Sequence, residues 1–309
     1  MDHAFDHRES CAFLAGLHGD PLAATANETS AWLLLEHAGP WGKNALRDSD
    51  LDPSVVAEFE RRLADTGARV QLMAPPVGER PQWTYIASDP REGTPWLVRL
   101  PTAAPRDLLE LDFGAVVAGR IPADADPVDE PLYVVCNNER SDPCCGRAGP
   151  PVHAAAQRRL GARCRATTHL GGHKYAANMI VYPYASNYGR LGPVSVLDVI
   201  DATEAGQIHL GQYRGRPAYT IPEQAAEHML RETQALTGLA DVRLATPAVD
   251  LGDECHRAGF TVNDGKRYDV VVRGTKRGPA RLQSCTDTKP GVPVVWSLET
   301  IKEAVDVDV

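Results

Sequence analysis

The sequence has no excess of positive charge. Its 309 residues include 32 lysines and arginines against 41 aspartates and glutamates, which gives a formal net charge of -9. Proteins that bind nucleic-acid phosphates normally present a basic surface, so we expect no nucleic-acid partner. Runs of eighteen apolar residues are missing too, which argues against a membrane-spanning helix. The first residues, MDHAFDHRES, lack a basic segment followed by an apolar one. We therefore expect a cytoplasmic protein without a membrane partner.

The chain also lacks the cysteine pattern of a disulfide scaffold. Its seven cysteines are odd in number, follow no regular spacing and include no Cys-x-x-Cys pair. Secreted disulfide frameworks and simple dithiol enzymes usually show one of these patterns. In a reducing compartment, clustered cysteines are more often metal ligands or redox groups.

The length and composition favour more than one folded unit. A chain of 309 residues that is 43% apolar and 24% charged is typical of a globular protein with room for two ordinary domains. The segment 121–131 is rich in prolines and acidic residues, which indicates a linker. We predict an N-terminal α/β domain at 1–125, a second domain at 131–215 and a C-terminal extension at 216–309.

Hydrophobic patterns predict alternating strands and helices. In the first third, a helix at 52–67 is capped by Asp52 and is followed by three strand candidates. The first third could be a diverged copy of the strand and helix pattern of the middle third. The remaining expectations are a strand at 132–136, a helix at 150–161 with prolines at its start, strands at 162–168 and 178–183, helices at 194–206 and 222–238, and a hairpin around Asp264 and Gly265.

Two histidines bracket a pair of glycines in the segment HLGGHKYAANMIVYP. His169 and His173 are four residues apart, which would place them on one face of a helix. Gly171 and Gly172 disfavour a helix, because each costs roughly 1 kcal/mol relative to alanine in a helix interior. We interpret the segment as a loop that can turn both imidazoles towards one metal site.

Two cysteines occupy a matching position in the preceding segment. Cys136 ends an apolar strand, and Cys145 follows after eight residues. Both loops can lie at the same end of a small sheet. Two thiolates and two imidazoles suit either tetrahedral zinc or a [2Fe-2S] cluster with one iron held by cysteines and the other by histidines. The spacing alone does not separate these two options.

The order of motifs resembles that of the thioredoxin-like [2Fe-2S] ferredoxins, with His169 and His173 in place of their second cysteine pair. Together with SDPCCG, HLGGHKYAAN and the earlier LLLEHAGPWGKNAL, it is similar to the sucrase/ferredoxin-like family. The resemblance implies a thioredoxin-like ferredoxin domain at 131–215 and a [2Fe-2S] cluster held by Cys136, Cys145, His169 and His173. It further implies an electron-transfer or redox-sensing role with an unidentified redox partner protein, and it gives no support for sucrase activity. We expect an electron carrier rather than an enzyme with its own substrate.

Neutral imidazole ligands would change the redox chemistry of such a cluster. They carry less negative charge than thiolates, which raises the reduction potential, as Rieske centres illustrate. An imidazole also keeps a second ring nitrogen that can hold a proton. We therefore expect reduction to be proton-coupled.

Several alternatives remain at this stage. Cys144, beside Cys145, is an alternative cluster ligand. A structural zinc site using the same two cysteines and two histidines, or a thiol oxidoreductase, could replace the cluster. Lys174, Tyr175, Asn178 and Arg190 are more often ordinary loop residues than supports for the imidazoles, and the remaining cysteines are expected to be buried small apolar residues: Cys11, Cys164, Cys255 and Cys285.

Overall fold

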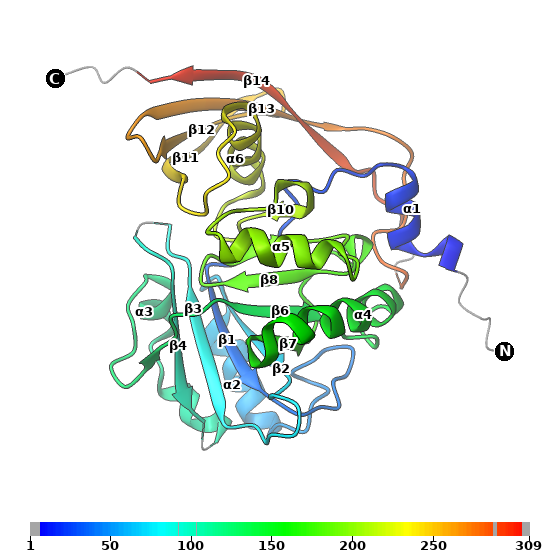
Figure 1. The fold of residues 1–309 in the computed structure, drawn as a ribbon, viewed down its shortest axis with the longest axis vertical. Coiled ribbons are helices and arrows are strands. Elements are labelled where there is room, and N and C mark those ends of the chain that lie inside the picture. Colours follow the sequence, from blue (N-terminus) through cyan, green and yellow to red (C-terminus); the bar gives the residue numbers. More distant parts are fainter. Residues whose placement is uncertain (1–6, 92, 103, 287–288, 305–309) are drawn as a thin grey trace.

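Two β-sheets organise the chain in the computed structural model, which describes residues 7–91, 93–102, 104–286 and 289–304 (Figure 1). The larger sheet has ten strands and the smaller one has four. Across the larger sheet the strands are, in order, β10 (Tyr213–Gly215), β9 (Ser186–Tyr188), β8 (Met179–Tyr182), β6 (Leu132–Cys136), β7 (Cys164–Thr167), β2 (Ala68–Met73), β1 (Ala31–Glu36), β3 (Trp83–Ser88), β4 (Trp96–Pro101) and β5 (Asp126–Pro127).

The two halves of the larger sheet repeat one connectivity. Strands β1 and β2 are parallel and joined through helix α2 (Pro53–Leu63), and β6 and β7 are parallel and joined through helix α4 (Pro143–Leu160). In each half the next two strands extend the sheet outwards in antiparallel pairing. Strands β3 and β4 follow β1 in the first half, and β8 and β9 follow β6 in the second. The halves meet where β2 pairs with β7, at Met73 and Thr167. The middle third therefore has the connectivity of the first third, as the sequence suggested.

The two halves of the large sheet pack against each other, each through one of its faces. Trp32 and Leu34 of β1 share a buried cluster with Val134 and Cys136 of β6. The opposite face of β6 and β8 packs against α4 and α5 (Ser195–Glu204), which lie side by side in Figure 1. The opposite face of β1 packs against α2 and the short helix α3 (Phe113–Val117). Alternate residues of β6 thus face two different cores, as the strand period requires.

The C-terminal part forms an antiparallel sheet of four strands, β11 (Val242–Gly252), β12 (Cys255–Val262), β13 (Arg267–Lys276) and β14 (Val294–Glu303). Helix α6 (Ile221–Gln234) packs on this sheet, with Leu230 of the helix in one buried cluster with Phe260 of β12 and Val270 of β13. The predicted hairpin joins β12 to β13, and Gly265 has the positive φ of +85° that its turn needs. The helix and the hairpin that the sequence predicted are both present, and two further strands extend the hairpin into a sheet.

Helix α4 begins earlier than the sequence predicted. We expected Pro150 and Pro151 to start it, but it begins at Pro143, and Asp142 caps it by accepting a hydrogen bond of 2.8 Å from the Cys144 N–H. Proline at the first helical position is favoured because its missing N–H is unpaired there in any case. The later pair is tolerated inside the helix. The cysteines at 144 and 145 therefore lie in a helical turn rather than in a loop.

A close approach fixes α4 against the end of β6. Gly149 of α4 lies so near the strand that a Cβ added to it would stand 2.0 Å from the Cys136 carbonyl oxygen. The glycine lets the helix reach the strand end that carries Cys136.

The mixed α/β class is confirmed, while the thioredoxin-like assignment and the domain boundaries stay predictions. Short strand β5 lies within the predicted linker at 121–131 and pairs with β4. Among the residues that the structure describes, none of the helices combines the length and the apolar character needed to cross a membrane.

Candidate metal centre

The four predicted ligands come from three neighbouring elements. Cys136 is the last residue of β6, and Cys145 lies in the first turn of α4. His169 and His173 lie in the loop between β7 and β8. Because β6 and β7 are parallel, the segments that follow them emerge at the same edge of the sheet.

The side chains of these residues converge. His169 Nδ1 lies 3.9 Å from the sulfurs of both Cys136 and Cys145, and His173 Nδ1 lies 3.6 Å from Cys145 Sγ. The ligand atoms of Cys136, Cys145 and His169 all lie within 4.8 Å of one another. His169 therefore presents Nδ1 to both sulfurs, and His173 presents Nδ1 to Cys145.

The thiols of Cys136 and Cys145 influence each other's ionisation. The hydrogen bond from Cys145, with a further contribution from His169, holds the pKa of Cys136 well below its usual value against the effect of burial. The same contact and burial raise the pKa of Cys145. The contact therefore disfavours ionisation of both thiols at once, and a bound cation would counter this effect.

The site is buried on the sulfur side and open on the histidine side. Cys136 and Cys145 are 0% and 1% exposed, whereas the side chain of His173 is 18% exposed. A cleft of about 930 Å³ reaches His169 and His173. Its other lining residues include more basic than acidic side chains, with Lys43, Arg47, Arg69, Lys174 and Arg214 against Glu60.

A comparison of sequences places this site in a known family. The sequence profile described as sucrase/ferredoxin-like matches residues 22–215, which contain all four predicted ligands. The chain belongs to the sucrase/ferredoxin-like family. No solved structure matches the chain.

Curated relatives of this sucrase/ferredoxin-like chain share the name altered inheritance of mitochondria protein 32. The protein from Meyerozyma guilliermondii is 32% identical over 101 residues, which cover 29% of this chain and 36% of the relative. The protein from Debaryomyces hansenii is 30% identical over 99 residues, covering 28% and 36%. The protein from Candida glabrata is 28% identical over 96 residues, covering 26% and 31%. The chain thus matches about a third of the length of these relatives.

The loop that carries the histidines has the conformation that its glycines allow. Gly171 and Gly172 have φ angles of +91° and +72°, and only a short 3-10 turn, His173–Tyr175, follows them. The prediction of a glycine loop is confirmed. A side chain at Gly172 would have to displace the Arg214 guanidinium, because an added Cβ would stand 2.4 Å from Nη2 of Arg214.

Arg214 anchors this loop through hydrogen bonds, and the sequence analysis did not identify Arg214 as part of the site. Its fully buried guanidinium donates to the carbonyl of Gly171 at 3.1 Å and to Oδ1 of Asn178 at 2.8 Å. Asn178 in turn donates to the carbonyl of Gly172 at 3.0 Å. Burial lowers the pKa of Arg214 to about 10, and the nearby thiols of the centre act in the opposite direction. No motif surrounds this residue in YRGRP, so no sequence signal marked it.

The other polar residues of the loop contact the N-terminal segment. Lys174 Nζ lies 3.0 Å from Asp20 Oδ2, and Arg190 donates to the Asp20 carbonyl at 2.7 Å. The ring of Tyr175 lies 5.0 Å from the Arg214 guanidinium carbon. These side chains fix the loop and do not point their donors at the sulfurs.

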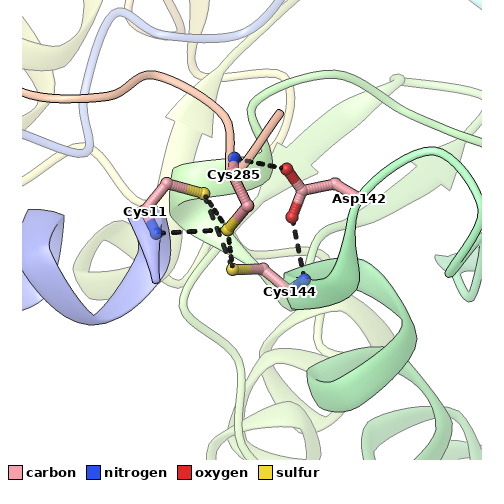
Figure 2. Close-up of side chains that lie close together, drawn as sticks. All are labelled: Cys11, Asp142, Cys144 and Cys285. Atoms are coloured by element: carbon pink, nitrogen blue, oxygen red, sulfur yellow. Dashed lines mark hydrogen bonds between the residues drawn. The ribbon is translucent and has the colours of Figure 1, made fainter. Parts of the chain in front are cut away.

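Cys144 faces away from the centre, towards two of the remaining cysteines. Its Sγ lies 3.5 Å from that of Cys11 and 3.4 Å from that of Cys285. Figure 2 shows the Cys144 side chain directed towards these two cysteines. Cys11 is buried as expected and Cys285 is partly exposed. The sequence did not indicate that tertiary contacts bring both of them to Cys144. Cys164 and Cys255 are buried and belong to neither of the two groups of described side chains that could hold a metal ion.

Proposed function

We propose that this sucrase/ferredoxin-like chain is an electron-transfer or redox-sensing protein that holds a [2Fe-2S] cluster through Cys136, Cys145, His169 and His173. The convergence of two sulfurs and two Nδ1 atoms at one sheet edge carries the proposal. Thiolates and imidazoles are the donors that such clusters accept. The family membership and the order of motifs, which resembles thioredoxin-like ferredoxins, support the same conclusion.

A [2Fe-2S] cluster would supply the uptake and release of a single electron. The residues around it would set its charge and its access. Cys136 and Cys145 supply negative sulfur donors on the buried side, and the buried cation of Arg214 partly offsets their charge. His169 and His173 supply neutral donors, and the ring nitrogen of each that does not face the sulfurs can hold a proton.

The cleft beside the histidines gives a route to a partner. It reaches His169 and His173 directly, so an unidentified redox partner protein would dock over this cleft. Such a partner would approach the imidazole side of the centre, where protein atoms leave the site open.

Zinc is the second candidate for the same four residues. Two cysteines and two histidines form a frequent structural zinc set, and the burial of the sulfurs suits a closed site. Cys136 and Cys145 could also act as a dithiol, since their thiols are in contact and the pKa of Cys136 is lowered. Cys144 and Cys145 do not form a dithiol in this structure, because the Cys144 sulfur faces Cys11 and Cys285 whereas the Cys145 sulfur faces the two histidines.

The visible spectrum and metal content of protein purified without oxygen decide among these functions. We expect a red-brown protein with about two irons and two acid-labile sulfides per chain, since a [2Fe-2S] cluster contains that number. The colour should disappear in Cys136→Ser. A colourless protein whose bound zinc is lost in Cys136→Ser would replace the cluster by a zinc site. A metal-free protein with a Cys136–Cys145 disulfide would favour the dithiol.

A further inference from the structure

Three cysteines from distant parts of the chain meet outside the proposed cluster site. Cys11 begins helix α1 (Cys11–Leu17), Cys144 lies in the first turn of α4, and Cys285 lies between β13 and β14. Their sulfurs form a triangle with sides of 3.5 Å (Cys11–Cys144), 3.4 Å (Cys144–Cys285) and 3.5 Å (Cys285–Cys11). Figure 2 shows the three side chains pointing towards one another.

We propose that Cys11, Cys144 and Cys285, with Asp142, form a second metal site that binds zinc. Zinc–sulfur bonds of about 2.3 Å in tetrahedral geometry place neighbouring sulfurs about 3.8 Å apart. The observed triangle is within a few tenths of an ångström of that spacing. A disulfide needs a bond of about 2.05 Å between two sulfurs and would leave the third thiol without a role.

Asp142 supplies a fourth donor. One of its oxygens lies within 4.8 Å of all three sulfurs. Its Oδ1 accepts the Cys144 N–H at 2.8 Å, and its Oδ2 accepts the Cys285 N–H at 2.8 Å. These two bonds connect the segments that carry Cys144 and Cys285 to the same carboxylate. Oδ1 keeps a lone pair that can bind a metal.

Backbone groups around two of these sulfurs can stabilise negative charge on them. The backbone N–H of Cys11 donates to Cys285 Sγ at 3.3 Å, which stabilises negative charge on that sulfur. Cys144 lies at the N-terminal end of α4, an 18-residue helix whose dipole favours an anion there. Three mostly buried thiolates in contact would repel one another unless a cation lies among them.

Such an ion would join both ends of the described chain to the centre of the fold. Cys11 and Cys285 are 274 residues apart in sequence, and Cys11 and Cys144 are 133 apart. Closing loops of this length lowers the entropy of the unfolded chain most, so the site would contribute to stability.

The test measures zinc and iron separately in the full chain, because the two proposed sites share no ligand side chain. We expect wild-type protein to contain about one zinc per chain in addition to its iron. Cys11→Ser and Cys285→Ser should lose the zinc and keep iron at the wild-type level, and Cys136→Ser should show the opposite pattern. Cys255→Ser, which removes a buried cysteine from neither group, is the matched control and should keep both metals.

A measurement on the wild type keeps the proposal testable if these variants do not fold. Iodoacetamide labelling followed by peptide mass mapping should show the cysteines at 11, 144 and 285 protected, and all three should become reactive together when a chelator removes zinc. Wild-type protein without zinc, zinc retained in both Cys11→Ser and Cys285→Ser, or a disulfide between two of the three would each overturn the proposal.

Discussion

The imidazole rings of His169 and His173 lie face to face, with centroids 3.8 Å apart and planes inclined by 10°. Their Nδ1 atoms lie 3.9 and 3.6 Å from the sulfur of Cys145. The glycine loop thus presents the two rings as one unit on one side of the thiol pair. A change that moves one ring will therefore disturb the other.

Neighbouring cysteines should respond oppositely to the same substitution. Cys145→Ser should abolish iron binding, because its sulfur faces both histidines and serine is a weaker donor for iron. Cys144→Ser should keep iron, since its sulfur faces Cys11 and Cys285. Iron assays of the two variants check this. Loss of iron in Cys144→Ser alone would mean that our choice of ligand is wrong.

Replacing both histidines should lower the reduction potential. The double change His169→Cys and His173→Cys adds two negative thiolates, which disfavour the added electron. Plant-type ferredoxins with four cysteines lie near about -400 mV, against roughly -150 to +300 mV for histidine-ligated Rieske centres. Protein-film voltammetry measures the difference. A wild-type potential no higher than that of the double variant would contradict histidine ligation.

The wild-type potential should also fall as pH rises. Reduction makes a metal-bound imidazole less acidic, so the reduced state takes up a proton and is favoured at low pH. The slope reaches at most about 59 mV per pH unit for one proton per electron. Voltammetry of wild type and double variant at several pH values checks the coupling. A potential that does not change with pH in the wild type would exclude it.

Removing Arg214 should destabilise both the fold and the centre. Arg214→Met leaves the Gly171 carbonyl and the Asn178 side chain without their buried donor. Each charge-assisted hydrogen bond contributes about 1.5–3 kcal/mol, so we expect a loss of about 3 kcal/mol or more, with lower iron occupancy. Chemical denaturation and iron assays measure both effects. Arg61→Met, which removes an exposed arginine paired with Glu58, should change little and is the control.

Two glycines with similar backbone angles should differ in their tolerance of alanine. Gly172 and Gly78 have φ angles of +72° and +84°, so both variants carry the left-handed strain of about 1–2 kcal/mol. Only Gly172→Ala places a Cβ against Arg214, whereas nothing lies within 4 Å at Gly78. Gly172→Ala should therefore lose more stability and also iron. Equal effects in the two variants would show that the clash is relieved without cost.

Local patterns predicted the elements that carry the centre. The apolar strand ending at Cys136 and the glycine loop around His169 depend on residues close in sequence, and both are present in the structure. The start of α4 was predicted incorrectly because Pro150 and Pro151 outweighed the cap at Asp142. The prolines indicate a helix start in isolation, but the helix is held by its packing against β6 and β8.

Contacts between remote segments could not be derived from the sequence. Arg214 reaches the histidine loop from 43 residues beyond Gly171, and no periodicity connects the two. Cys11 and Cys285 are single cysteines in unrelated contexts, so only the fold shows that they meet Cys144. Spacing rules identify ligands on one loop, whereas sites assembled from several segments require the tertiary structure.

The contact between Gly149 and the end of β6 predicts which substitutions a mutagenesis screen would find damaging. The Cys136 carbonyl oxygen lies only 2.0 Å from the place where a Cβ would stand, so any side chain at 149 must push α4 away from the strand. That shift would separate Cys145 from Cys136. In a random mutagenesis screen scored by colony colour, substitutions at 149 should be as damaging as substitutions of a ligand, although glycine has no side chain to bind a metal.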